Sequence, residues 1–214
     1  MEAGTKCMRL SLGKPTPEQI RSFFDRQKGA PFSYPDVGAT RSTLPPGWTV
    51  DHNRVRLGQG REDFAAACAA VRRWEMFRIG WVEIQGADAP LAPGLLVGPL
   101  AHVFGVWFLN ACRVVYLLEE ERRFGFAYGT LPAHAESGEE RFSVEWREED
   151  DSVWYDLLAF SRPGQWLTRL GQPVVRRLQK RFAKASMAAM ERAVRAPSPS
   201  LPRGAGEGAP SRMD

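Results

Sequence analysis

Cysteine and histidine are scarce in this chain, which has three of each among 214 residues. Cys7, Cys68 and Cys112 lie far apart, form no CxxC pair and have no pair of histidines nearby. A zinc site or a disulfide framework needs closely spaced ligands or a set of paired thiols. We therefore expect no metal site, and we interpret the cysteines as buried or incidental thiols of a reducing compartment.

A long hydrophobic run is also missing. No apolar segment follows Lys6, and the most apolar stretch, residues 89–118, is interrupted by a proline and by polar residues before it is long enough to span a membrane. We therefore expect no transmembrane segment and a cytoplasmic protein.

The chain carries little net charge, because 29 basic and 25 acidic side chains leave a formal charge of +4. This excess is too small to argue for nucleic-acid binding, and no nucleic-acid partner is expected. Basic residues do gather between Arg169 and Arg195, so one end of the molecule should be positive.

Motifs for nucleophilic or nucleotide chemistry are absent as well. There is no Gly-x-Ser-x-Gly, and no cysteine has an identifiable histidine partner, so covalent catalysis has no support. Gly58-Gln-Gly60 lacks the third glycine and the Gly-Lys-Ser/Thr ending of phosphate-binding loops. We interpret it as a strand-to-helix turn and expect no cofactor.

The composition that remains is that of a globular protein, with 43% hydrophobic and 25% charged residues. We predict a flexible N-terminus over residues 1–8 and a single α+β domain over residues 9–195. Residues 196–214 are dominated by Pro, Ser, Gly and Ala and predict a disordered tail.

Three helices are predicted. Thr16-Pro-Glu-Gln19 begins the first with a capping box, and apolar residues between positions 64 and 74 recur at helical spacing. A long apolar stripe predicts a third helix over about residues 165–195, in which Pro173 marks either a kink or the true start. Residues 29–48, rich in proline and glycine, predict an irregular connection.

The remaining segments predict strands. Residues 48–57 read as extended with a phase slip that suggests a bulge near Asn53, and residues 77–81 alternate as a strand. Residues 95–161 have the alternation and turns of an antiparallel meander. We therefore predict an α+β fold in which a curved antiparallel β-sheet wraps around a long C-terminal helix, with room between the two.

Six segments and His134 together are characteristic of a known family. The segments are Ser33-Tyr-Pro-Asp-Val-Gly-Ala-Thr40, Val50-Asp-His-Asn-Arg-Val-Arg-Leu-Gly-Gln-Gly60, Ala111-Cys-Arg-Val-Val-Tyr116, Phe124-Gly-Phe-Ala-Tyr-Gly-Thr-Leu-Pro132, Ser137-Gly-Glu-Glu-Arg-Phe142 and Ala159-Phe-Ser-Arg-Pro163. In this order they resemble domain-of-unknown-function family 1990, whose uncharacterised members occur in bacteria and plants. The resemblance covers roughly residues 9–195.

This resemblance implies a helix-grip fold of the START and Bet v 1 type. Proteins of that type mostly hold lipids, sterols or polyketides, and some act as cyclases. The family itself has no established activity, and a fold alone does not imply a function.

Glu140 is the first candidate site residue, because it alternates with Phe142 and Val144 on the predicted buried face of a strand. A desolvated carboxylate there would have a raised pKa and could act as an acid or anchor a ligand. The alternative is a structural ion pair with Arg113 or Arg162, which would hold the loop.

Three tyrosines are the next candidates. Tyr116, Tyr128 and Tyr155 alternate beside apolar residues, so their hydroxyls could converge on a ligand from an apolar wall. The alternative is that they are core aromatics whose hydroxyls bond to neighbouring protein groups.

His134 lies in a loop with three glutamates nearby and could exchange protons near neutral pH. No ligand spacing supports a metal, and the simpler interpretation is a histidine that stabilises its loop. The candidate ligand contacts are therefore Tyr116, Tyr128, His134, Glu140, Tyr155 and Arg162.

The leading hypothesis is a binder of an apolar or amphipathic small molecule between sheet and helix, without catalysis. A second hypothesis is an enzyme that uses Glu140 or His134 as acid or base. A third is a peripheral membrane or partner-binding module that uses the basic face of the C-terminal helix, notably Arg176, Arg177, Lys180 and Arg181.

Overall fold

The structure, a computed structural model, describes residues 9–164 and 172–196. The predicted flexible N-terminus, all but the first residue of the predicted disordered tail, and residues 165–171 lie outside these ranges. The elements, in chain order, are β1 Arg9–Ser11, α1 Pro17–Asp25, η1 Ala39–Arg41, β2 Thr49–Gln59, α2 Gly60–Arg72, η2 Glu75–Phe77, β3 Val82–Gln85, β4 Leu96–Val103, β5 Val106–Leu109, β6 Cys112–Glu120, β7 Arg123–Thr130, β8 Glu136–Trp146, β9 Ser152–Pro163 and α4 Gln172–Arg195.

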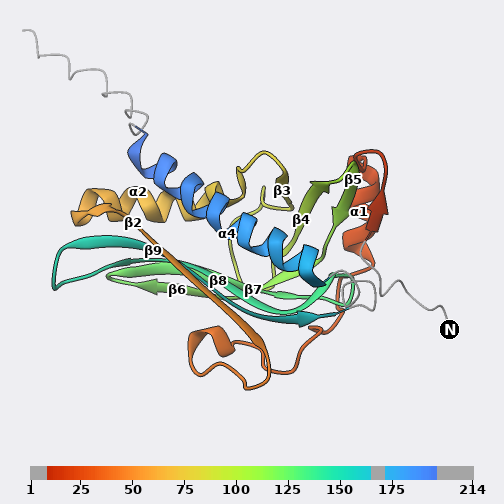
Figure 1. The fold of residues 1–214 in the computed structure, drawn as a ribbon, viewed down its shortest axis with the longest axis horizontal. Coiled ribbons are helices and arrows are strands. Elements are labelled where there is room, and N and C mark those ends of the chain that lie inside the picture. Colours follow the sequence, from red (N-terminus) through yellow and green to blue (C-terminus); the bar gives the residue numbers. More distant parts are fainter. Residues whose placement is uncertain (1–8, 165–171, 197–214) are drawn as a thin grey trace, which may run out of the picture.

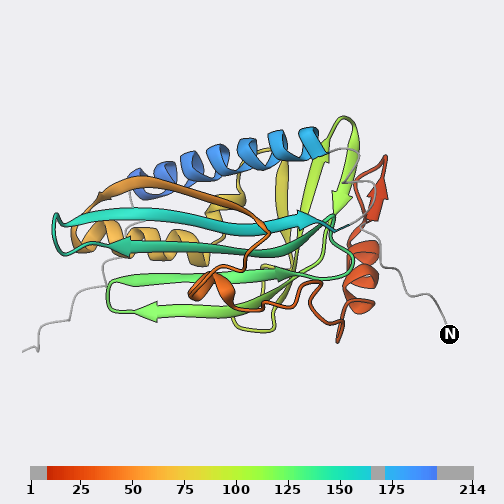
Figure 2. The same cartoon turned by 60° about the horizontal axis from the view of Figure 1, so that its bottom comes forward.

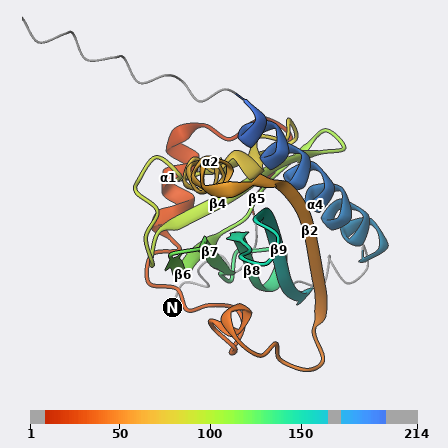
Figure 3. The ribbon, with the colours of Figure 1, turned by 90° about the vertical axis from the view of Figure 1, so that its left-hand side faces the viewer.

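The described strands form one antiparallel sheet in the order β1-β5-β4-β6-β7-β8-β9-β2, with β3 paired to β4 outside this path. The strands β6 to β9 form a meander in chain order, whereas β4 pairs with β5 on one side and with β6 on the other. β2 lies at the far edge beside β9, as Figure 2 shows. The sheet curves, and α2 and α4 cover its inner face (Figures 1 and 3). The predicted curved sheet with its C-terminal helix is confirmed.

Local signals explain the helix boundaries. Thr16 caps α1, since the Gln19 N–H donates to its side chain while the Gln19 side chain accepts from the Thr16 N–H. α4 runs from Gln172 to Arg195 with Pro173 in its first turn, where a proline is tolerated because its nitrogen has no helical acceptor. The part of the third predicted helix before Gln172 lies outside the described residues. No helix in the described ranges is long and apolar enough to cross a membrane.

The core lies between the inner face of the sheet and the two long helices. Phe126, Phe142 and Tyr155 are completely or almost completely buried there, and α4 adds Met190 and Val194. Burial of aromatic side chains of this size is the main stabilising contribution to such a core. α2 packs on the sheet beneath the C-terminal half of α4 (Figure 1).

The outer face of the sheet is covered by residues 26–48, which we call the outer segment; Figure 3 shows it on the side opposite α2 and α4. Glu139 on β8 holds this segment, because its carboxylate accepts hydrogen bonds from the Tyr34 hydroxyl at 2.7 Å and from the N–H groups of Gly38 at 2.6 Å and Thr40 at 2.9 Å. The Thr40 hydroxyl donates to the same carboxylate. The buried carboxylate of Glu139 therefore fixes the position of the outer segment, which corresponds to the predicted irregular connection.

Gly129 allows this packing. A Cβ atom at this position would lie 2.1 Å from the Tyr34 hydroxyl oxygen, so only glycine lets Tyr34 reach the sheet.

Two local predictions need correction. The register between β2 and β9 runs unbroken through Asn53, and the irregularity lies between Arg56 and Gly58. Phe77 belongs to the short helix η2, so the strand predicted over residues 77–81 begins only at Val82. Trp74, at φ 56°, ends α2 with a left-handed residue and turns the chain before the strand.

Candidate functional site: a cavity between the sheet and the C-terminal helix

A cavity of about 520 Å³ lies between the inner face of the sheet and the N-terminal half of α4. Its residues come from β2, η2, β3, β4, β5, β7, β8, β9 and α4, and from the loops that precede β3, β6 and β8. The cavity exists because α2 fills the space beneath only the other half of α4, and no α2 residue lines it.

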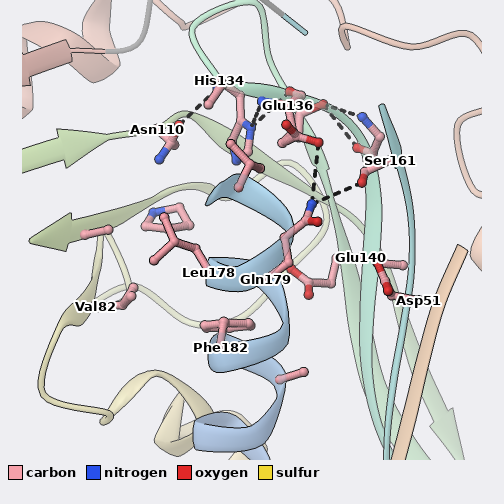
Figure 4. Close-up of a pocket in the computed structure, with 18 of the residues that line it drawn as sticks. Asp51, Val82, Asn110, His134, Glu136, Glu140, Ser161, Leu178, Gln179 and Phe182 are labelled. Carbon is pink, nitrogen blue, oxygen red and sulfur yellow. Dashed lines mark hydrogen bonds between the residues drawn. The ribbon is translucent and has the colours of Figure 1, made fainter. Parts of the chain in front are cut away.

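The wall of the cavity is mostly apolar. Its apolar members include Phe77, Trp81, Val82, Leu157, Leu178 and Phe182. Figure 4 shows Leu178, Phe182 and Val82 on one side of the cavity, with the labelled polar residues at its upper end and opposite wall. An apolar body with a few polar groups at defined positions is the usual design of a small-molecule pocket.

Glu140 lies on the opposite wall, where Tyr128 donates a hydrogen bond of 2.7 Å to its carboxylate. Burial raises the pKa of Glu140 to about 7, the Tyr128 hydrogen bond opposes this shift, and the negative charge of Asp51 adds to it. Within the described ranges, no Arg, Lys or His side chain forms an ion pair with Glu140. The carboxyl group can therefore change its ionisation near neutral pH.

A polar network joins α4 to the sheet beside the cavity. Arg176 donates two hydrogen bonds to the Asp51 carboxylate, at 2.5 and 2.7 Å, and a third to the Gln179 side-chain oxygen at 2.7 Å. The Gln179 amide in turn donates to Ser161 at 3.3 Å and to Glu136 at 3.5 Å, as Figure 4 shows. Asp51 is thus neutralised by a bidentate pair.

His134 lies at the polar end of the cavity. Its Nδ1 atom lies 2.9 Å from the backbone nitrogen of Glu136 and 3.0 Å from the carbonyl oxygen of the same residue, so it accepts from the first or donates to the second according to the tautomer. Burial lowers the pKa of His134 to about 4. The imidazole is therefore neutral at physiological pH and holds the turn into β8.

The structure does not bring all three predicted tyrosines together. Tyr128 lines the cavity, but Tyr116 lies on the outer face, where its hydroxyl bonds to that of Thr40 at 2.8 Å. The reason is an irregularity in β6 between Val114 and Tyr116, which sends these two residues to opposite faces. Simple alternation from Val114 would have put Tyr116 inside.

Tyr155 and Arg162 lie outside the cavity wall. Tyr155 is fully buried on the inner face beneath α4, and its hydroxyl bonds to Ser186 at 2.9 Å. The guanidinium of Arg162 lies 4.2 Å from the ring centroid of Trp48, and Arg162 is not among the residues that line the cavity. Arg113 donates to the backbone oxygens of Ala30 and Gln27, so neither predicted cation pairs with Glu140.

The basic face of α4 is partly engaged. Arg176 pairs with Asp51, and the guanidinium of Arg181 lies 4.7 Å from the ring centroid of Trp81. Arg177 and Lys180 are exposed. Two of the four basic side chains named for contact with a lipid surface, Arg176 and Arg181, therefore interact with other side chains of the protein.

Sequence reasoning missed the β2 contribution to the site. Asp51 and Asn53 line the cavity, opposite Ala159 and Leu157 on β9. The signal was present, since Asp51 and Asn53 continue the alternation of Val55 and Leu57, which pack in the core. Gln179 was missed because a single glutamine within an apolar helical stripe gives no signal of its own.

Within residues 9–164 and 172–196, no three His, Cys, Asp or Glu side chains come together in a way that could hold a metal ion.

Comparisons with known proteins agree with the segments singled out in the sequence. The model of a domain of unknown function, DUF1990, matches residues 33–189. A UPF0548 protein of Dictyostelium discoideum is 34% identical over 202 residues, which cover 85% of this chain and 94% of that protein. A UPF0548 protein of Deinococcus radiodurans is 38% identical over 184 residues, covering 81% and 92%.

A hypothetical protein of Helicobacter pylori, known from a crystal structure, is similar in fold. The TM-score is 0.51 at 13% sequence identity, and the match covers 70% of this chain and 91% of that one. Identity this low shows a shared fold alone. The family match and the two UPF0548 relatives carry the assignment: the chain belongs to the DUF1990 family.

Proposed function

We propose that this protein binds an apolar or amphipathic small molecule in the cavity between the sheet and α4. The observation that carries the proposal is the cavity itself, whose volume of about 520 Å³ falls within the range of roughly 300–1,000 Å³ typical of ligand pockets. An apolar wall stabilises the ligand's body by removing it from water, and the few polar groups fix its orientation.

The proposed contacts combine predicted and newly found residues. Tyr128, Glu140 and His134 supply polar groups from the sheet side, and Gln179 supplies one from α4. Tyr116 is not among them, because its side chain lies on the outer face.

Filling the cavity should abolish binding. Ala159 lies on the cavity wall next to Glu140, and a phenylalanine at this position would occupy the space that a ligand needs. We expect Ala159→Phe to weaken binding of the neutral fluorophore N-phenyl-1-naphthylamine at least about tenfold, which corresponds to roughly 1.4 kcal/mol. Fluorescence titration measures the dissociation constant.

The matched control is Ala65→Phe, which makes the same change at an exposed position of α2. It should leave the dissociation constant unchanged. Equal binding by the wild type and Ala159→Phe would mean that the fluorophore binds elsewhere, and the cavity would lose its proposed role.

The second candidate function is acid or base catalysis on a bound molecule by Glu140. The pKa of this carboxyl, about 7, favours it, because proton transfer is most effective when the pKa is near the working pH. In that case Glu140→Gln would bind the substrate with similar affinity but lose turnover. His134 is a weaker candidate, since its pKa of about 4 keeps it neutral and its Nδ1 atom is engaged with the backbone.

A further inference from the structure

We propose that the ligand of this cavity is an amphipathic amine, with an apolar body along the α4 side and a protonated amino group paired with the Glu140 carboxylate. This inference rests on the proposed function and adds the chemical class of the ligand. It follows from three observations: the charges that face the cavity, the aromatic side chains near Glu140, and a buried carboxylate oxygen of Glu136, also on β8, that accepts no hydrogen bond from the described residues.

The charged side chains in the described part of the cavity wall are predominantly negative, and two of the carboxylates have no ion-pair partner there. Asp51 is neutralised by Arg176, and the Glu139 carboxylate turns to the outer segment. This leaves Glu140 and Glu136 facing the cavity without a paired cation among the described residues. An amine would supply the missing positive charge, whereas an anionic head group would be repelled.

The bases near the cavity do not reverse this balance. Lys180 contributes to the wall but is an exposed residue of α4, so its ammonium group remains in contact with water. His134 is neutral, because burial lowers its pKa to about 4. A fatty acid or a phosphate ester would therefore find no buried cation to pair with among the described residues of the wall.

Aromatic side chains complete a cation-binding environment. The ring of Phe77 lies between those of Tyr128 and Phe182, with centroid separations of 6.4 and 5.3 Å, and all three residues line the cavity. Aromatic faces attract ammonium groups, especially where water is excluded. The hydroxyl of Tyr128 also fixes the position of the Glu140 carboxylate.

Glu136 offers a second acceptor. Its Oε1 atom is buried and has no hydrogen-bond partner among the described residues, although Oε2 accepts from Gln179. A buried oxygen without a partner is costly, and an N–H or O–H group of a ligand would satisfy it. A ligand that carries a further donor beyond its amino group therefore fits the polar end of the cavity.

The ionisation of Glu140 agrees with this assignment. Burial and the charge of Asp51 raise its pKa, while Tyr128 is the neighbour that opposes the shift. A ligand ammonium group beside the carboxylate would lower that pKa again, since an opposite charge favours the ionised form. At neutral pH an alkyl amine is protonated, so the pair needs no additional proton donor.

Three probes with one alkyl chain and different head groups test the inference. Decylamine, decanol and decanoate are titrated into the protein near pH 7.5, below their aggregation concentrations, by isothermal calorimetry. We expect decylamine to bind about tenfold or more tightly than decanol, because the charged pair is stronger than a neutral hydrogen bond, and decanoate to bind most weakly.

Glu140→Gln assigns the preference to one residue. In this variant decylamine and decanol should bind with about equal affinity, since the neutral amide cannot pair with the ammonium group. Glu62→Gln, which removes a carboxylate from an exposed position of α2, should retain the full preference.

The outcomes separate the two proposals. Binding of decanol or decanoate as tightly as decylamine overturns the amine assignment but supports the cavity as a binding site. A preference for decylamine that survives in Glu140→Gln also overturns it. Failure of all three probes to bind contradicts the proposed function itself.

Discussion

Replacing Glu139 by glutamine is expected to destabilise the protein by about 3 kcal/mol or more, because the carboxylate lies among hydrogen-bond donors only. The Tyr34 hydroxyl and the N–H groups of Gly38 and Thr40 all point at it from the outer segment. The amide nitrogen of glutamine is itself a donor, so at least one of these groups would lose its acceptor in a buried site. Urea unfolding at neutral pH measures the loss.

Tyr34→Phe provides the comparison for this prediction. It removes a single donor to Glu139 and should cost only about 1 kcal/mol, the usual net contribution of one hydrogen bond. If Glu139→Gln were no more destabilising than Tyr34→Phe, the buried carboxylate would not be what holds the outer segment on the sheet.

The neighbouring substitution Glu140→Gln should have the opposite effect. The pKa of Glu140 rises from 4.5 to about 7 on folding, so the folded state binds the proton more tightly than the unfolded state. The cost of ionising the buried carboxyl is absent below about pH 4.5, grows up to about pH 7 and is constant above it. Without ligand, the variant should be more stable than the wild type by about 3 kcal/mol near pH 8.

The pH dependence is the decisive part of this prediction. Near pH 4 the two proteins should be equally stable, because the protonated acid and the amide both accept the Tyr128 hydrogen bond. For the control Glu62→Gln, at an exposed position of α2, the difference from the wild type in the free energy of unfolding should be the same near pH 4 and near pH 8. A Glu140→Gln variant that is less stable than the wild type near pH 8 would reveal a cation that compensates the carboxylate.

These two glutamates differ because successive residues of a strand point to opposite faces. Glu139 has its donors in the outer segment, and Glu140 faces the cavity with one donor, Tyr128. The alternation of Phe142 and Val144 was enough to predict which face Glu140 occupies, and this prediction is confirmed by the register of β8. The partners of Glu139 were beyond prediction, since they lie about 100 residues away in a segment without periodicity.

The fold could largely be predicted because its signals are local. The capping box at Thr16, the helical spacing before Trp74 and the strong alternation of β8 each depend on a few adjacent residues. The hairpin between β4 and β5 was missed: Phe104 and Gly105 both have positive φ values, and a phenylalanine there gives no turn signal.

The candidate site was harder to predict, because the pairing and register of strands that are distant in the sequence decide which residues meet there. The irregularity in β6 moves Tyr116 to the outer face, and no composition signal marks it. Asp51 enters the cavity only because β2 crosses to the edge of the sheet beside β9. Such long-range pairing depends on the whole fold.

The central claim, that the cavity binds an apolar or amphipathic molecule, is tested most directly by a crystal structure of the protein crystallised with saturating decanol. We expect ordered density for the alcohol in the cavity, with its chain along Leu178 and Phe182 and its hydroxyl toward Glu140. The Ala159→Phe protein crystallised in the same way should lack this density. An empty cavity in the wild type under these conditions, or alcohol bound only outside it, would contradict the account.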